Sequence, residues 1–75
     1  MNGLAYNRKN HTEFVTFSAD VNQMNAKIQH YFGDGGADVV LIKNSKQMVM
    51  LERNDHEVTK HTTTTLNYHP LAKHL

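Results

Sequence analysis

The sequence contains no cysteine and only one proline among its 75 residues. Without cysteine, the chain forms neither a disulfide framework nor a thiolate site for zinc or an iron–sulfur cluster. A chain of this length buries only about 60–65% of the surface that it exposes when unfolded, so its stability depends on a dense core or on a partner. The absence of cysteine also fits a reducing compartment, and we expect a cytoplasmic protein.

Long apolar runs and an excess of charge are also missing. No run approaches the ~20 apolar residues that a transmembrane helix needs, and residues 1–10 contain no apolar stretch typical of a signal peptide. Eight lysines and arginines stand against seven aspartates and glutamates, which gives a net charge of +1 with neutral histidines. We therefore expect no membrane association and no strong electrostatic attraction to nucleic acid.

The most apolar stretch, Val39–Leu51, predicts a β-hairpin around a polar break at residues 43–47. A strand buried on one face alternates apolar and polar residues, whereas a continuous apolar run indicates burial on both faces. With Asn44-Ser45 as a two-residue turn, Leu41 would lie opposite Met48; a longer loop with a shifted register is the alternative. The alternation defines a Met48 face (Val39, Leu41, Met48 and Met50) and a Val40 face (Val40, Ile42, Val49 and Leu51).

Residues 19–32 predict a helix. Asp20 is a good N-cap, and Gln23 lies three residues further on, where its side chain can reach back in a capping box. Gly33 is placed to end the helix in the left-handed conformation that glycine tolerates. An apolar stripe at helical spacing indicates the face that packs in the core: Val21, Met24, Ile28, Tyr31 and Phe32.

Two further strands are indicated by β-branched and aromatic residues, at Thr12–Ser18 and at Glu57–Leu66. The second is polar for a central strand, so we place it at or near an edge of the sheet, where Lys60 discourages unwanted pairing. Residues 1–10 are polar and are predicted as a flexible arm, and residues 67–75 as a tail. Three tail side chains are expected to dock on the sheet: Tyr68, Leu71 and Leu75.

These elements predict a single domain, residues 1–75, of the α+β class. We expect a small antiparallel sheet of about four strands, in the chain order strand–helix–strand–strand–strand, with one helix packed on one face. The helix is assigned to the Val40 face, because stiff β-branched side chains suit a fixed core. The Met48 face is then left without an element that fully covers it.

Six histidines are the unusual feature of the composition. They are scattered along the chain, and their spacing matches no zinc motif, so we expect no metal site and no cofactor. Serine, histidine and acidic residues are present, but no pattern brings a nucleophile, a base and an orienting acid together. The protein is accordingly predicted not to be an enzyme and to have no catalytic residues.

An exposed apolar face on a soluble protein usually marks an interaction site, and methionines adapt to the shape of a partner. The Met48 face is therefore the predicted partner surface, with Val39, Leu41, Met48 and Met50 as its contact residues. We expect a small regulator or inhibitor that binds protein without catalysis, as a homodimer, on a larger protein target, or both. A short chain without cysteine or motif also suits a phage or mobile-element accessory protein.

Nucleic-acid binding is the alternative function. Its candidate contacts are the basic side chains Arg8, Lys9, Lys43 and Lys46, with aromatic residues on a sheet face available to stack on bases. The near balance of basic and acidic residues, and the lack of an aromatic cluster typical of RNA-binding sheets, argue against it. Protein binding is therefore the preferred interpretation.

Overall fold

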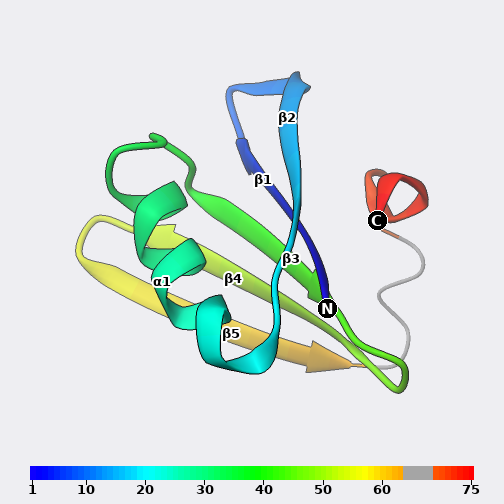
Figure 1. Ribbon diagram of the computed structural model, residues 1–75. Helices are drawn as coiled ribbons and strands as arrows, with labels where there is room; N and C mark the ends of the chain where they lie inside the picture. Colours follow the sequence, from blue (N-terminus) through cyan, green and yellow to red (C-terminus); the bar gives the residue numbers. More distant parts are fainter. Residues whose placement is uncertain (64–68) are drawn as a thin grey trace.

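The protein forms a five-stranded antiparallel sheet with one helix on one face, in the computed structural model shown in Figure 1. The structure describes residues 1–63 and 69–75, with the backbone alone at His11 and Thr63. The predicted α+β class is confirmed, and the strands lie in the order β2-β1-β3-β4-β5. The elements are β1 Asn2–Asn7, β2 Asn10–Ser18, α1 Val21–Phe32, β3 Val39–Lys43, β4 Met48–Asn54, β5 Glu57–Thr63 and the 3-10 helix η2 Ala72–His74.

The expectation of a flexible N-terminal arm is wrong, because residues 2–7 form strand β1 inside the sheet. This strand pairs with both β2 and β3, and its four residues from Gly3 to Tyr6 are all buried. The strand was not predicted because its short buried segment is flanked by Asn2 and Asn7, and asparagine is typical of turns and loops. Gly3 has a steric role, since a Cβ atom there would collide with the ring of Phe17 on β2.

Helix α1 begins as predicted. The Asp20 carboxylate accepts a hydrogen bond from the Gln23 backbone N–H at 2.9 Å, and the Gln23 side chain accepts one from the Asp20 N–H at 3.3 Å. The helix ends differently, because Gly33 has φ −87° and the left-handed glycine is Gly36, with φ +68°. The buried apolar stripe is also shorter than predicted, because Val21, the first residue of the helix, is 73% exposed.

The β3–β4 hairpin has a longer loop than the two-residue turn. The Asn44 backbone N–H donates to the Gln47 carbonyl, and the Asn44 side chain accepts hydrogen bonds from the Lys46 and Gln47 N–H groups, both at 2.8 Å. Leu41 therefore pairs with Met50 instead of Met48, as the shifted-register alternative anticipates. A shift of two residues keeps every side chain on its predicted face.

The Val40 face lies beneath α1, as predicted. Val40 and Ile42 are buried against Met24 and Phe32 of the helix, and Leu51 packs at the border of this cluster. The other face of the sheet carries the second cluster, Leu4, Tyr6, Val39 and Leu41.

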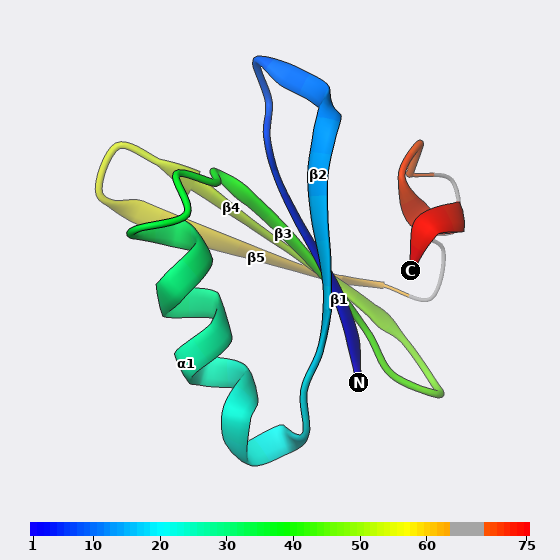
Figure 2. The same cartoon turned by 45° about the horizontal axis from the view of Figure 1, so that its top comes forward.

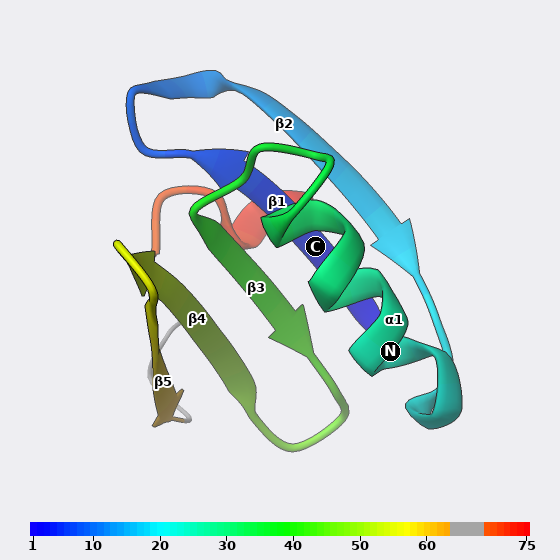
Figure 3. The same ribbon diagram turned by 90° about the vertical axis from the view of Figure 1, so that its left-hand side faces the viewer.

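The expectation that the Met48 face is uncovered is wrong. Leu41 is fully buried, and Met48 is only 4% exposed. Residues 69–75 lie against this side of the sheet, opposite α1 (Figure 3), and Leu71 and Leu75 pack on its apolar cluster. Docking of these two side chains confirms the prediction for the tail, whereas Tyr68 lies outside the described residues.

Strand β5 is an edge strand, as predicted, and it pairs along its length with β4. It ends at Thr63, and the predicted continuation to Leu66 lies outside the described residues. Within residues 1–63 and 69–75, no helix has the length and apolar character needed to cross a membrane.

Candidate partner-binding groove

A single helix is too narrow to cover five strands. Neighbouring strands lie about 4.8 Å apart, so five of them span about 20 Å, whereas a helix with its side chains is about 10 Å wide. Helix α1 packs over the middle of the sheet, against β3 (Figure 2). The helix side of β4 and β5 is therefore left without an element above it in the described part of the chain.

An open groove of about 700 Å³ follows from this arrangement, between α1 and the two strands β4 and β5. Its helix wall is formed by Met24, Ile28 and Phe32. These residues are spaced four apart and therefore lie on one side of α1. Its floor and outer wall come from alternate residues of three strands, which point to the same face: Ile42, Val49, Leu51, Val58 and Lys60.

Arg53 joins strand β4 to the C-terminal end of α1. Its Nη1 atom donates a hydrogen bond of 2.6 Å to the Phe32 carbonyl, and its guanidinium carbon lies 5.8 Å from the centre of the Phe32 ring. A cation at this position also interacts favourably with the dipole of the helix. Arg53 therefore fixes the distance between the helix and β4 at this end of the groove.

The charged side chains that line the groove are all cationic. Lys60 and Arg53 contribute positive charge, and none of the described lining residues is an aspartate or a glutamate. Arg53 is held by the Phe32 carbonyl, whereas Lys60 forms no ion pair with any described residue. The groove therefore combines an apolar floor with an available positive charge on its outer wall.

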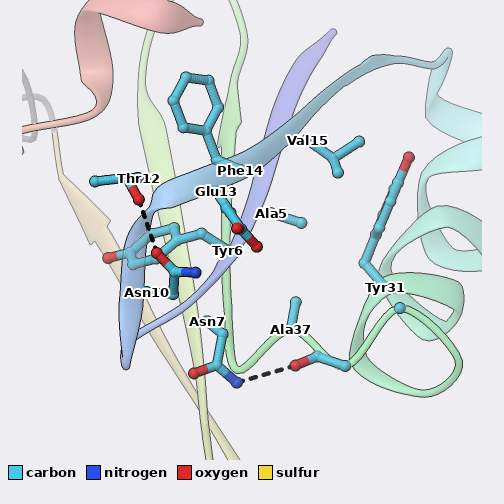
Figure 4. Close-up of a pocket in the computed structure, with 12 residues that line it drawn as sticks. Ala5, Tyr6, Asn7, Asn10, Thr12, Glu13, Phe14, Val15, Tyr31 and Ala37 are labelled. Atoms are coloured by element: carbon cyan, nitrogen blue, oxygen red, sulfur yellow. Dashed lines mark hydrogen bonds between the residues drawn. The ribbon is translucent and has the colours of Figure 1, made fainter.

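A second hollow, of about 530 Å³, lies on the other flank of α1 (Figure 4). The small side chains of Ala5 and Ala37 leave space between β2 and the Tyr31 ring, and the Glu13 carboxylate points into this space. Asn7 donates a hydrogen bond of 3.2 Å to the Gly36 carbonyl, which ties the β1–β2 turn to the loop after the helix. This hollow is more polar than the groove, and its charge has the opposite sign.

The basic residues of the nucleic-acid alternative do not form one patch. Asn2 pairs with Lys43, and Tyr6 pairs with Val39, so the turn after β1 and the loop after β3 lie at opposite ends of the sheet. Lys9 is exposed at the first end, and Lys43 and Lys46 are exposed at the other.

Arg8 is occupied by neighbouring groups of the chain. Its guanidinium lies 3.2 Å from Asp38 and 3.4 Å from Glu52, and its Nη2 atom donates to the Arg53 carbonyl and to the Asn54 side chain, both at 2.9 Å. These bonds link the β1–β2 turn to β3 and β4. The side chain is therefore less available for a phosphate group than the sequence suggests.

Three of the described histidines contact different side chains at separate places in the fold. His61 lies 3.1 Å from Glu52, the His69 ring is 3.0 Å from the Tyr6 hydroxyl, and the His74 ring packs 4.6 Å from the Phe14 ring. Among the described residues, no three histidine or acidic side chains come close enough together to hold a metal ion.

Tyr6 has a perturbed titration. Burial raises the pKa of its hydroxyl, and the carboxylates of Asp38 and Glu52 raise it further, against the opposing charge of Arg8. The hydroxyl is therefore kept protonated and available for its contact with His69.

The structure separates the predicted contact residues from the open apolar surface. Val39, Leu41 and Met48 are buried within the chain, and Met50 is partly buried beside the tail. The groove on the opposite side was not anticipated, although the Val40 face and Val58 supply part of its lining. The sequence does contain one indication of an uncovered strip, because a single predicted helix is narrower than a sheet of several strands.

Comparison with known proteins gives no match, either to a family model or to a curated protein or solved structure.

Proposed function

We propose that the protein is a non-catalytic protein-binding module, a small regulator or inhibitor that acts through the groove between α1 and strands β4 and β5. The observation that carries the proposal is the open apolar strip on the helix side of the sheet. Val58 is 52% exposed there, and Val49 and Leu51 remain partly exposed beside it. Contiguous exposed apolar surface on a small protein is typical of an interaction site.

The composition of the groove favours binding over catalysis. Its lining includes no serine, threonine, cysteine, histidine or carboxylate side chain among the described residues. These types most often supply a nucleophile or a general base, and Lys60, the one lysine of the described lining, has none of them beside it in the groove. The apolar floor and cationic outer wall instead offer burial and charge pairing, which are the two contributions that a docked protein segment needs.

A pair of matched substitutions tests this function. Val58 and Val15 are both 52% exposed, but Val58 lines the groove and Val15 lies on the other flank of α1. Val58→Glu places a charged side chain in the apolar contact, opposite Arg53 on β4, and is expected to abolish partner binding, because the charge must be desolvated where apolar surface would have been buried. Val15→Glu adds the same charge at equal exposure and is expected to leave binding intact.

The measurement is affinity capture from an extract of the source cells, followed by mass spectrometry of the retained proteins. A companion that is retained by the parent and by Val15→Glu, but lost by Val58→Glu, supports the proposal. A companion retained equally by all three proteins contradicts it. Circular dichroism of each variant establishes that the fold is kept.

Self-association is the other form of this function. Sedimentation of the parent and of Val58→Glu at matched concentration distinguishes a homodimer from binding to a larger target. A dimer that dissociates on Val58→Glu places the groove in a homodimer interface, and a monomeric parent assigns the groove to another protein.

A further inference from the structure

We infer that the occupant of the groove is an amphipathic helix of a partner protein, with carboxylate side chains directed at Lys60. The inference rests on the proposed protein-binding function and specifies the shape and charge of the partner segment. It follows from the width of the uncovered strip, the charges on its walls and the composition of α1.

The width of the strip fits a helix. With α1 over the central strand β3, strands β4 and β5 lie about 5 and 10 Å to one side of it. Helices that pack side by side have axes 8–10 Å apart, so a helix beside α1 would lie over β4 and β5. Its apolar stripe would then contact Ile28 on one side and Leu51 and Val58 below.

An added strand does not fill the same space. Strand β5 has a free edge within the described sheet, and an extended peptide could pair with it there. Such a peptide continues the sheet outward in its own plane, because paired strands lie side by side. The floor formed by Val49 and Leu51 on β4 would stay uncovered, so pairing at the edge leaves the apolar groove open.

The charges select an acidic partner. Lys60 stands on the outer wall without an ion pair to a described residue, and the described lining contains no carboxylate. A helix with glutamate or aspartate beside its apolar stripe places a carboxylate opposite Lys60, whereas a basic helix brings like charges together. Complementary charges of this kind determine the choice of partner and the orientation of binding.

A second copy of this chain is a poor source of the helix. The side of α1 that faces away from the sheet carries Asn22, Gln23 and His30 in place of a second apolar stripe. The sequence of α1, Val21–Phe32, contains no acidic residue. Its helix therefore offers neither the stripe nor the carboxylate that the groove requires.

The test is selection from two displayed peptide libraries. The first contains Ala-rich helices of about 18 residues, long enough to be helical alone, with large apolar residues on one face and Glu, Gln or Lys varied beside it. The second contains extended peptides rich in β-branched residues. We expect binders from the helical library, enriched in Glu on one flank and retained by Val15→Glu but not by Val58→Glu.

Charge reversal tests the role of Lys60. Lys60→Glu should weaken the selected helices by about fivefold and shift selection toward Lys, since an exposed ion pair is worth up to about 1 kcal/mol. Lys43→Glu is the matched control, because Lys43 is exposed outside the groove. Circular dichroism should show that a selected peptide gains helix on binding.

Each other outcome overturns a defined part of the inference. Helical binders without preference for Glu refute the charge assignment, and binders from the extended library alone refute the helix, while the proposed function stands in both cases. A parent dimer that Val58→Glu dissociates replaces the partner helix with a second copy. The proposed function itself is refuted if neither library yields a binder and if, in the capture experiment, Val58→Glu retains the same proteins as the parent and Val15→Glu.

Discussion

The two faces of the sheet are covered by different means and to different extents. One face is packed against a 12-residue helix, and the other against a short segment that contains a single 3-residue 3-10 helix. Both faces are closed at their centre, where Leu41 and Val40 are each 0% exposed, but on β4 Met48 is buried on the tail side whereas Val49 is only partly buried on the helix side. On the helix side, Val58 is 52% exposed, and the groove runs beside α1.

The difference lies in the side chains at the margins. Beside the tail, the long side chains of Phe14 on β2 and Met50 on β4 pack against the apolar cluster together with Leu71 and Leu75. On the helix side, the corresponding strip over β4 and β5 carries the shorter side chains of Val49, Leu51 and Val58. The extent to which a sheet face is shielded from solvent thus depends on the length of the side chains beside the covering element as well as on the size of that element.

The largest effect is expected from truncation in the closed face. Leu41→Ala should lower the free energy of unfolding by about 3 kcal/mol, because it removes a fully buried side chain and leaves a cavity. Val58→Ala, in the open groove, should change it by less than about 0.5 kcal/mol. Urea denaturation of both variants provides the measurement, and equal losses would show that the groove is as closed as the site of Leu41.

A charge in the tail tests whether this short segment closes its face. Leu71→Asp should destabilise the protein by about 2 kcal/mol, since Leu71 packs on the apolar cluster and the charge must be exposed or desolvated. Val21→Asp, at a position that is 73% exposed on α1, should be nearly neutral. Binding of a fluorescent apolar dye by Leu71→Asp, absent in the parent, would show that the face has opened, and an unchanged Leu71→Asp protein would refute the covering role.

Removal of the Arg8 bridge should have a smaller effect. Arg8→Ala loses contacts to Asp38, Glu52 and Asn54, but the side chain is 40% exposed, so solvent screening reduces the expected cost to about 1 kcal/mol. Lys9→Ala is the control at the neighbouring exposed position. Thermal unfolding at low and high salt should show a smaller gap at high salt. A salt-independent gap would assign the loss to packing instead of charge.

An effect of similar size, but one that depends on pH, concerns the Tyr6 hydroxyl. At neutral pH, Tyr6→Phe should cost about 1 kcal/mol, because the contact of the hydroxyl with His69 is lost. The pKa of Tyr6 is raised in the folded protein, chiefly by burial, so the folded state holds this proton more tightly than the unfolded state. The stability from this term is present below about pH 10 and is lost as the pH rises through the folded pKa.

Comparison of the parent with Tyr6→Phe isolates this term, because all other groups titrate in both proteins. Urea denaturation at pH 7 and above pH 10 should show the difference between them shrinking with rising pH. A difference that grows at high pH would contradict the sign of the pKa shift.

The sequence predicts the features of the fold that follow from local chemistry and from strand alternation. It misses the features that depend on tertiary context. The capping box at Asp20, the edge position of β5 and the division of the β3–β4 hairpin into two faces are all confirmed, because they follow from local chemistry and a period of two. Strand β1 was missed because its core segment is only four residues long and includes Gly3. Its burial depends on pairing with β2 and β3, which no local pattern encodes.

The interaction surface was misplaced for a related reason. The sequence indicates more apolar strand surface than one helix can cover, but it does not indicate which face receives the tail. Leu71 and Leu75 are the residues that decide this, since their packing closes the Met48 face. The excess surface is then left over β4 and β5, beside the helix.

The difference between the two faces is tested most directly by methyl NMR of the free protein with a soluble paramagnetic agent. The agent broadens the signals of methyl groups that it can approach. We predict strong broadening at Val58, weaker broadening at Val49 and Leu51 on the helix side of β4, and none at Met48 on the tail side of β4 or at Leu4 and Leu41, in line with their exposure. Broadening at Leu4 and Leu41 comparable to that at Val58 would contradict the account, because the face under the tail would then be as open as the groove.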